Sequence, residues 1–187
     1  MHPANPTARA APPSPRSRGD WAPSALPATT PPASSRLECS PPGRKALDPS
    51  PELAALRAKT EQFLRQAVSE FAPVDDRYEV PYRSTRLIVH PIAWTRGRTL
   101  LRFIAPVVLG LHEGPELHAR LSELNNTTIF GKFYLMDGAV WIEHNLLGES
   151  LDWEQFRAVL ASVAHHADHL DEQLIAEFGG HRWSERG

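Results

Sequence analysis

Apolar side chains recur at spacings of three and four in the first regularly patterned part of the chain. This spacing predicts an amphipathic helix of about five turns. Ser50, Pro51 and Glu52 favour a helix start there, because a capping hydroxyl, an early proline and an acid near the positive end of the helix dipole all stabilise the first turn. Pro73 is expected to end the segment. The apolar stripe consists of Leu53, Leu56, Thr60, Phe63, Ala67 and Phe71.

After residue 77 the spacing changes to two, which is typical of β-strands. Residues 78–82 predict a short edge strand, since Pro81 has no N–H to donate to a central ladder. That edge could accept a client by strand addition, although Pro81 favours a blunted edge instead. Residues 87–94 and 99–109 are rich in β-branched residues and predict a hairpin in which Pro91 and Pro106 lie at edges or bulges.

A second, shorter helix is expected to open at Gly114, Pro115 and Glu116 and to end at Asn125 and Asn126. Its leucines recur at helical spacing and predict a single buried seam. They are Leu117, Leu121 and Leu124.

Asp137 and Gly138 form the strongest two-residue hairpin signal in the chain. Counting outward from this turn pairs apolar residues on one face, which we expect to be core. The other face pairs an aromatic with an aromatic and a cation with an anion. The predicted pairs are Leu135 with Val140, Tyr134 with Trp141, Phe133 with Ile142, and Lys132 with Glu143.

A long helix is predicted after the hairpin, with Asp152 as its N-cap and residues 179–180, both glycine, as its stop. The complete order is helix, three strands, helix, two strands, helix. Because hairpins dominate, we expect an α+β fold with an antiparallel sheet of about five strands and three helices.

The first 49 residues differ from the rest of the chain in composition. They are crowded with proline, alanine, serine and arginine, and such a segment cannot bury enough apolar surface to offset its ordering entropy. The sequence therefore predicts a disordered tail over residues 1–49, a folded domain over residues 50–182 and a short C-terminal tail over residues 183–187.

Residues 50–187 have a formal charge of −5, from fourteen basic and nineteen acidic residues. This balance does not resemble the basic footprint of a nucleic-acid-binding protein. The single cysteine, Cys39, cannot form an internal disulfide, which favours a reducing, cytoplasmic compartment. No apolar run approaches the roughly 20 residues needed to span a bilayer, so no membrane partner is expected.

Over about residues 51–182, and most clearly between Asn125 and Gly180, the chain resembles the YbjN-like and type III secretion chaperone-like superfamily, and its actinobacterial branch of short chaperone-like domains in particular. The similarity lies in FGKFYLMDGAVWIEHNLLGESLD, in the helix end HLDEQLIAEFGG, in the segment FIAPV at residues 103–107 and in the PEL opening of the second helix. It implies a small domain, often dimeric, that binds an extended peptide on apolar surface and has no known catalytic residues.

The last helix carries three histidines that could contribute to a metal site: His165, His166 and His169. His165 and His169 are four residues apart and share a helical face with Glu172 one turn further on, a geometry that could hold zinc. A solvated polar face explains the same pattern, and we prefer it. No nucleophile elbow, phosphate loop or dinucleotide fingerprint occurs, so we expect no enzyme, no metal and no cofactor.

Five aromatic or apolar residues are the candidates for a peptide-binding or dimer-interface surface: Tyr134, Met136, Trp141, Trp94 and Phe103. Our preferred hypothesis is a non-enzymatic, chaperone-like domain that holds an extended or apolar client segment on the sheet face or in a groove by the first helix. The alternative is a structural or regulatory homodimer whose aromatic sheet face is the subunit interface. A metal-dependent enzyme using His165 and His169 is a distant third.

Overall fold

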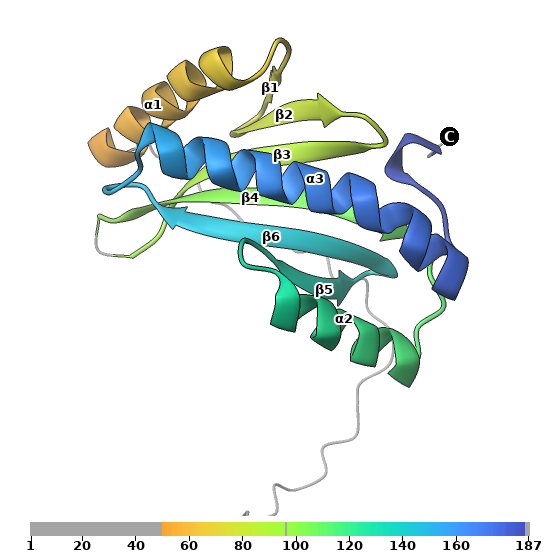
Figure 1. Cartoon of the computed structure of the whole chain (residues 1–187). Helices are drawn as coiled ribbons and strands as arrows, with labels where there is room; N and C mark the ends of the chain where they lie inside the picture. Colours follow the sequence, from red (N-terminus) through yellow and green to blue (C-terminus); the bar gives the residue numbers. More distant parts are fainter. Residues whose placement is uncertain (1–49, 96, 186–187) are drawn as a thin grey trace, which may run out of the picture. The chain divides into compact units, whose positions relative to one another are not determined.

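The computed structural model describes residues 50–95 and 97–185, and these form an α+β fold (Figure 1). The predicted tail over residues 1–49, including Cys39, lies outside the described residues. The elements in chain order are α1 (Pro51–Ala67), β1 (Ala72–Val74), β2 (Arg77–Tyr82), β3 (Thr85–Ala93), β4 (Thr99–Leu109), α2 (Pro115–Thr127), β5 (Lys132–Met136), β6 (Ala139–Leu147), α3 (Trp153–Phe178) and the 3₁₀ helix η1 (Trp183–Glu185). The predicted fold class and order are confirmed, with six strands in place of about five.

The strands form one antiparallel sheet in the order β1-β2-β3-β4-β6-β5. The register of β5 and β6 is the one that counting from the Asp137–Gly138 turn predicted, with all four pairs confirmed. A two-residue turn fixes this register, because a slip by one residue would move every core side chain to the opposite face.

β1 is the strand that the sequence pattern did not predict. It has three residues, pairs with Arg77, Tyr78 and Glu79 of β2, and contains Pro73. The first half of β2 is therefore internal to the sheet. Only its second half is an edge, and Pro81 lies there, beyond the last pair with β1.

The other strand prolines lie where the ladder tolerates a missing N–H. Pro106 borders the register shift between β4 and β6, as predicted. Pro91 pairs with Leu101 of β4, and on its other side it lies past Val89, the last β3 residue paired with β2. Trp94 lies outside β3, in the turn that leads to β4.

Both long helices begin at the residues that the sequence indicated. Ser50 caps α1, and the Asp152 carboxylate accepts a hydrogen bond from the Gln155 backbone N–H at the start of α3. α1 ends at Ala67, because Val68 is already extended. Phe71, predicted as the last residue of the helical stripe, instead lies between α1 and β1 and packs edge-on against Tyr78.

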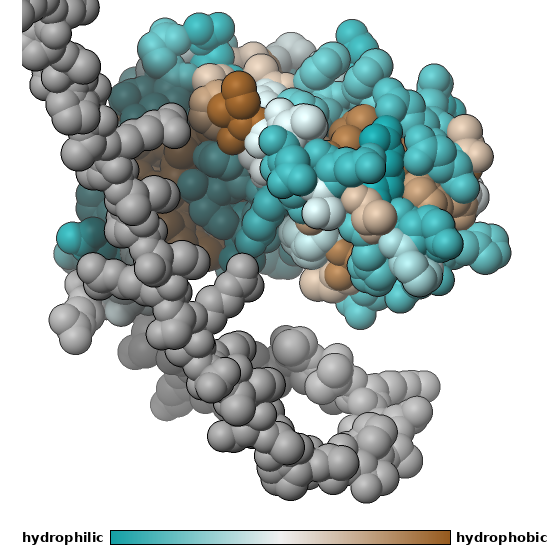
Figure 2. Space-filling view, turned by 60° about the horizontal axis from the view of Figure 1, so that its bottom comes forward, coloured by the Kyte–Doolittle hydropathy of each residue, from teal (hydrophilic) through white to brown (hydrophobic). Residues whose placement is uncertain are grey.

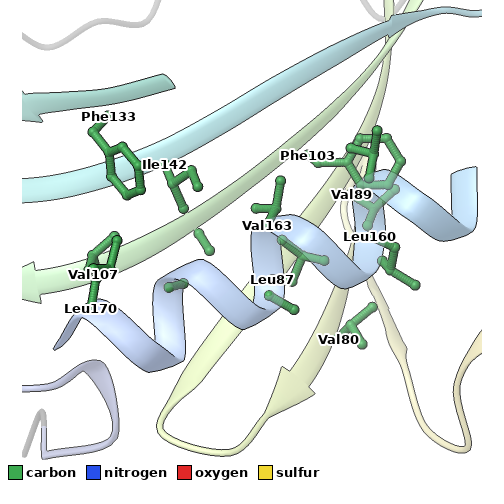
Figure 3. Packing of buried hydrophobic residues seen from close by; sticks show 14 of the residues in the cluster. Val80, Leu87, Val89, Phe103, Val107, Phe133, Ile142, Leu160, Val163 and Leu170 are labelled. Atoms are coloured by element: carbon green, nitrogen blue, oxygen red, sulfur yellow. The ribbon is translucent and has the colours of Figure 1, made fainter. Parts of the chain in front are cut away.

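The core lies between the sheet and the pair formed by α1 and α3 (Figure 1). α3 crosses the middle strands, and its buried side chains meet inward-facing residues of β3, β4 and β6 (Figure 3). Phe103 of β4 is fully buried and packs edge-on against Phe156 of α3. Among the described residues, no helix covers the opposite side of the sheet, which we call the outer face; its central positions are Ile88, Ile104, Trp141 and Tyr134.

The C-terminal residues pack on the domain. Arg182 pairs with the buried Asp171 of α3 at 3.0 Å, and His181 bridges to Leu109. Residues 183–185, assigned to a tail from sequence, form η1, and the Ser184 N–H donates to the Ser84 carbonyl. In the described part of the chain, no helix has both the length and the apolar character needed to cross a membrane.

Candidate peptide-binding surfaces

An apolar pocket opens on the helix side of the sheet, where α1 ends. Its volume is about 170 Å³. α1 contributes Ala67, β2 and β3 contribute Val80 and Leu87, and α3 contributes Leu160, Ala161 and Ala164. The pocket is thus formed by segments that are far apart in sequence.

Small side chains create this pocket. Ala161 and Ala164 are three residues apart on α3 and therefore lie on one side of the helix. Ala67 occupies the last position of α1 and Val68 follows it, so no long side chain fills the space between the helices. Because its walls are aliphatic, the pocket favours an apolar group over water.

Charged and aromatic groups border the pocket. Arg157 contributes to its wall and is paired with Glu154 at 2.7 Å. Tyr82 forms another part of the wall, and the Arg83 guanidinium lies 5.5 Å from the centre of its ring.

The outer face is a second candidate surface, and it carries two of the predicted residues. Tyr134 and Trp141 are cross-strand partners and are both half-buried. The Tyr134 hydroxyl donates to the Glu143 carboxylate at 3.2 Å, and the Asn145 amide donates to the same group at 2.6 Å. The face is therefore an aromatic and polar network, not a continuous apolar patch.

The network perturbs its titratable groups. Burial, together with the adjacent Glu143 charge, raises the pKa of Tyr134 to about 12. Burial would also raise the pKa of the Glu143 carboxyl. The hydrogen bond from Asn145 and the charges of Arg102 and Lys132 outweigh that effect, and the pKa of Glu143 is lowered.

The five residues predicted as a binding or interface surface do not form one site. Met136 is 44% exposed at the turn end of β5, close to Tyr134, whereas Trp94 is 57% exposed in the turn between β3 and β4. Phe103 is a correction: it faces inward with Leu101 and is inaccessible to a partner. Its facing could not be fixed from sequence, because two prolines in the β3–β4 hairpin leave the register open.

The histidine face of α3 shows no metal-binding arrangement in the part of the chain that the structure describes. The rings of His165 and His169 stack with their centres 5.5 Å apart, and both residues are exposed. Glu172, the third proposed ligand, is paired with Arg182 at 2.6 Å. This geometry is that of a solvated helix surface.

Figure 2 shows the side of the molecule that carries α2. Where grey atoms do not cover it, the surface is mainly hydrophilic, and hydrophobic residues emerge as small, separate patches. The exposed large apolar residues include Ile129 and Phe130, in the loop between α2 and β5.

The individual lining residues of the pocket by α1 were not predicted, since only the packing of α1 against α3 brings them together.

Comparison with known proteins gives a family. Residues 54–186 match the family described as T3SS (YopN, CesT) and YbjN peptide-binding chaperone 1. No curated protein matches the chain. Among solved structures, one chain of the crystal structure of the ExsC-ExsE complex is similar over 65% of this chain and 93% of that chain, with 22% identity and a TM-score of 0.48.

Proposed function

Because the chain belongs to the T3SS (YopN, CesT) and YbjN peptide-binding chaperone 1 family, we propose that it holds an extended client segment by burying an apolar side chain in the pocket beside α1. The match over residues 54–186 confirms the family resemblance predicted from the sequence. The family is described as one of peptide-binding chaperones. The client and its contacts with this chain are the proposed part.

The observation that carries the proposal is the apolar lining of the pocket. Typical small-molecule sites measure roughly 300–1,000 Å³ and combine an apolar wall with a few convergent polar groups. This pocket has a volume of about 170 Å³, and eight of its nine lining residues are uncharged, Arg157 being the ninth. Its size and chemistry suit one aliphatic or aromatic side chain of a peptide.

The sheet edges support insertion of a side chain over addition of a strand. Asn125 of α2 occupies the free edge of β5, where its amide bonds both the N–H and the carbonyl of Phe133. At the other edge β1 is short and contains Pro73, and Pro81 lies in the unpaired part of β2. Both edges therefore offer a client few backbone partners.

Modest affinity is expected for such a client. An extended segment loses conformational entropy when it binds, and that cost offsets much of the gain from burial. Burying one leucine or phenylalanine side chain contributes about 1.5–3 kcal/mol. The pocket should thus discriminate strongly between an apolar and a charged central residue while allowing the client to be released.

The test is to fill the pocket. Ala161 lies on the exposed side of α3 and contributes to the pocket wall, so Ala161→Phe should occupy the space without disturbing the core. Ala176→Phe is the matched control, because Ala176 is exposed on the same helix and is not part of the pocket. The probes are fluorescent synthetic peptides that differ only in a central leucine, phenylalanine or glutamate.

Fluorescence anisotropy with the full chain measures the affinity. We expect the leucine and phenylalanine peptides to bind and the glutamate peptide to bind poorly. Ala161→Phe should weaken binding by about 10-fold or more, and Ala176→Phe should leave it unchanged. Equal affinity for all three peptides, or no effect of filling the pocket in a folded variant, would contradict the proposal.

A further inference from the structure

The outer face has an ordered charge pattern that the pocket does not use. One row of cross-strand partners runs from Glu79 of β2 through Ile88 and Ile104 to Glu143 of β6. Neighbouring strands lie roughly 4.8 Å apart, so the two carboxylates are about 14 Å from each other with two isoleucines between them. The row thus has a charged group at each end and an apolar centre.

Each carboxylate in this row is shared by two cations. Glu79 pairs with Arg77 at 3.5 Å and with Arg86 at 2.5 Å. Glu143 lies 3.6 Å from Arg102 and 3.7 Å from Lys132. Each end of the row therefore keeps one uncompensated positive charge, although the domain as a whole is acidic.

The cations lie above the carboxylates. The side chains of Glu79 and Glu143 are only 14% and 9% exposed, whereas the four cationic side chains are between 39% and 62% exposed. A third carboxylate, Asp76 in the turn after β1, is bonded to His90 at 3.0 Å. Asp76 is 57% exposed, but Glu79 and Glu143 are not, so a partner approaching the two ends of the row meets guanidinium and ammonium groups above those two acids.

We propose that the outer face docks an acidic amphipathic helix of a partner protein, with its apolar side chains over Ile88 and Ile104 and its carboxylates at the Arg86 and Lys132 ends of the row. A separation of about 14 Å corresponds to roughly nine residues of helix, at 1.5 Å per residue. The face lies on the opposite side of the sheet from the apolar pocket. The chain would then hold a client on one side and a second protein on the other.

A helix suits this face better than other occupants. Packing a helix on an uncovered sheet face is a standard way to bury its apolar positions, and it needs no free sheet edge. A second copy of the same face would set the four cations against four identical ones. A nucleic acid would gain phosphate contacts, but it would leave the two isoleucines and Trp141 without apolar partners.

The experiment measures binding of a labelled helical peptide to the full chain. The probe carries glutamates near both ends of one face and leucines between them, and the control peptide has lysines in place of the glutamates. Arg86→Glu and Lys132→Glu are each expected to lower the affinity for the acidic peptide by about 10-fold. Arg65→Glu is the matched control, since Arg65 is also a surface arginine paired with a glutamate at 2.5 Å, but on α1.

Further outcomes decide between the occupants. Binding of the acidic peptide that is insensitive to both charge reversals, or equal binding of the lysine peptide, overturns the proposal. So does a dimer that dissociates on Lys132→Glu, or a single-stranded oligonucleotide that competes with the peptide. Ala161→Phe should leave this affinity unchanged, so this proposal and that of the apolar pocket can fail separately.

Discussion

Tyr134 and Glu143 couple an aromatic ring to a buried charge on the outer face. The hydroxyl donates to the carboxylate, and this contact favours the neutral phenol beside the ionised acid. Lys132, whose ammonium lies 5.9 Å from the centre of the Tyr134 ring, adds a cation above the same pair. The geometry holds the ring against the sheet and fixes the direction of its hydroxyl.

This coupling should be visible in an alkaline titration. We expect the Tyr134 phenol to ionise with a pKa near 12, against the ordinary value of 10.0, because burial and the Glu143 charge both oppose the phenolate. Since the unfolded chain ionises first, the contribution of Tyr134 to stability is complete below pH 10 and is lost as the pH rises through about 12. Ultraviolet titration of the phenolates measures it directly.

Two variants separate the causes of the raised pKa. Tyr134→Phe should remove the latest ionisation step, and Tyr82→Phe should leave that step in place. Glu143→Gln should lower the pKa of Tyr134, because it removes the charge while keeping most of the burial. A titration in which Tyr134→Phe changes only the early phenolate signal would show that this ring is more open to solvent than the structure indicates.

The sequence predicts the facing of Tyr134 and not that of Phe103, and the reason is local. Tyr134 is three residues from a two-residue turn, so counting from Asp137 and Gly138 determines its face. Phe103 belongs to a hairpin with a longer turn and two prolines, where one extra residue reverses every side chain. Its burial depends on the contact with Phe156, about 50 residues later in the chain, and no local pattern reports that contact.

At the scale of elements, α2 does more than complete the core. Its leucine seam packs inward, as its spacing predicted, and its last turns run along the free edge of β5. Asn125 was predicted to end the helix, but it lies within α2 and bonds to the backbone of Phe133 instead. α2 therefore protects a strand edge that would otherwise be open to pairing with another chain.

Removing this protection should have two effects. Asn125→Ala leaves the Phe133 N–H and carbonyl without their partner, which should lower the free energy of unfolding by about 1–2 kcal/mol. It should also promote concentration-dependent association through the exposed edge. Urea unfolding measures the first effect, and light scattering over a concentration series measures the second.

Asn126→Ala serves as the control, because Asn126 is the adjacent exposed residue of the same helix. It should change stability by much less. If the two variants unfold at the same urea concentration and remain equally monodisperse, the bonds from Asn125 do not protect the edge.

The elements that were predicted and the one that was missed differ in how their signals arise. The helices have capping residues and a repeating apolar stripe, and the β5–β6 hairpin has its two-residue turn. The residues that predict each of these elements therefore lie within the element itself. β1 has only three residues, of which Ala72 and Pro73 are exposed, and it has no apolar alternation. It is a strand only because β2 supplies its hydrogen bonds. The pattern of apolar and polar residues does not predict the pocket either, since the pocket depends on how closely α1 approaches α3.

At the scale of the whole domain, the helix side and the outer face have different chemistry. On the helix side α1 and α3 cover the core, and small side chains leave an aliphatic space at the pocket beside α1. No described helix covers the outer face, which has charged groups at both ends of one cross-strand row and two isoleucines between them. If both proposed sites bind, the domain would hold a client and a second protein on opposite sides of the sheet.

The homodimer alternative makes a definite prediction about this arrangement. If the aromatic outer face were the subunit interface, Trp141→Glu would place a buried negative charge in it and would dissociate the dimer. We expect instead that the molar mass of the full chain, measured by light scattering, is the same for the wild type and for Trp141→Glu. A face-to-face dimer would bring the four exposed cations of one copy against those of the other, which disfavours it. A mass that halves on substitution, with the circular dichroism unchanged, would show that a second copy occupies the outer face and would leave the pocket beside α1 as the binding site.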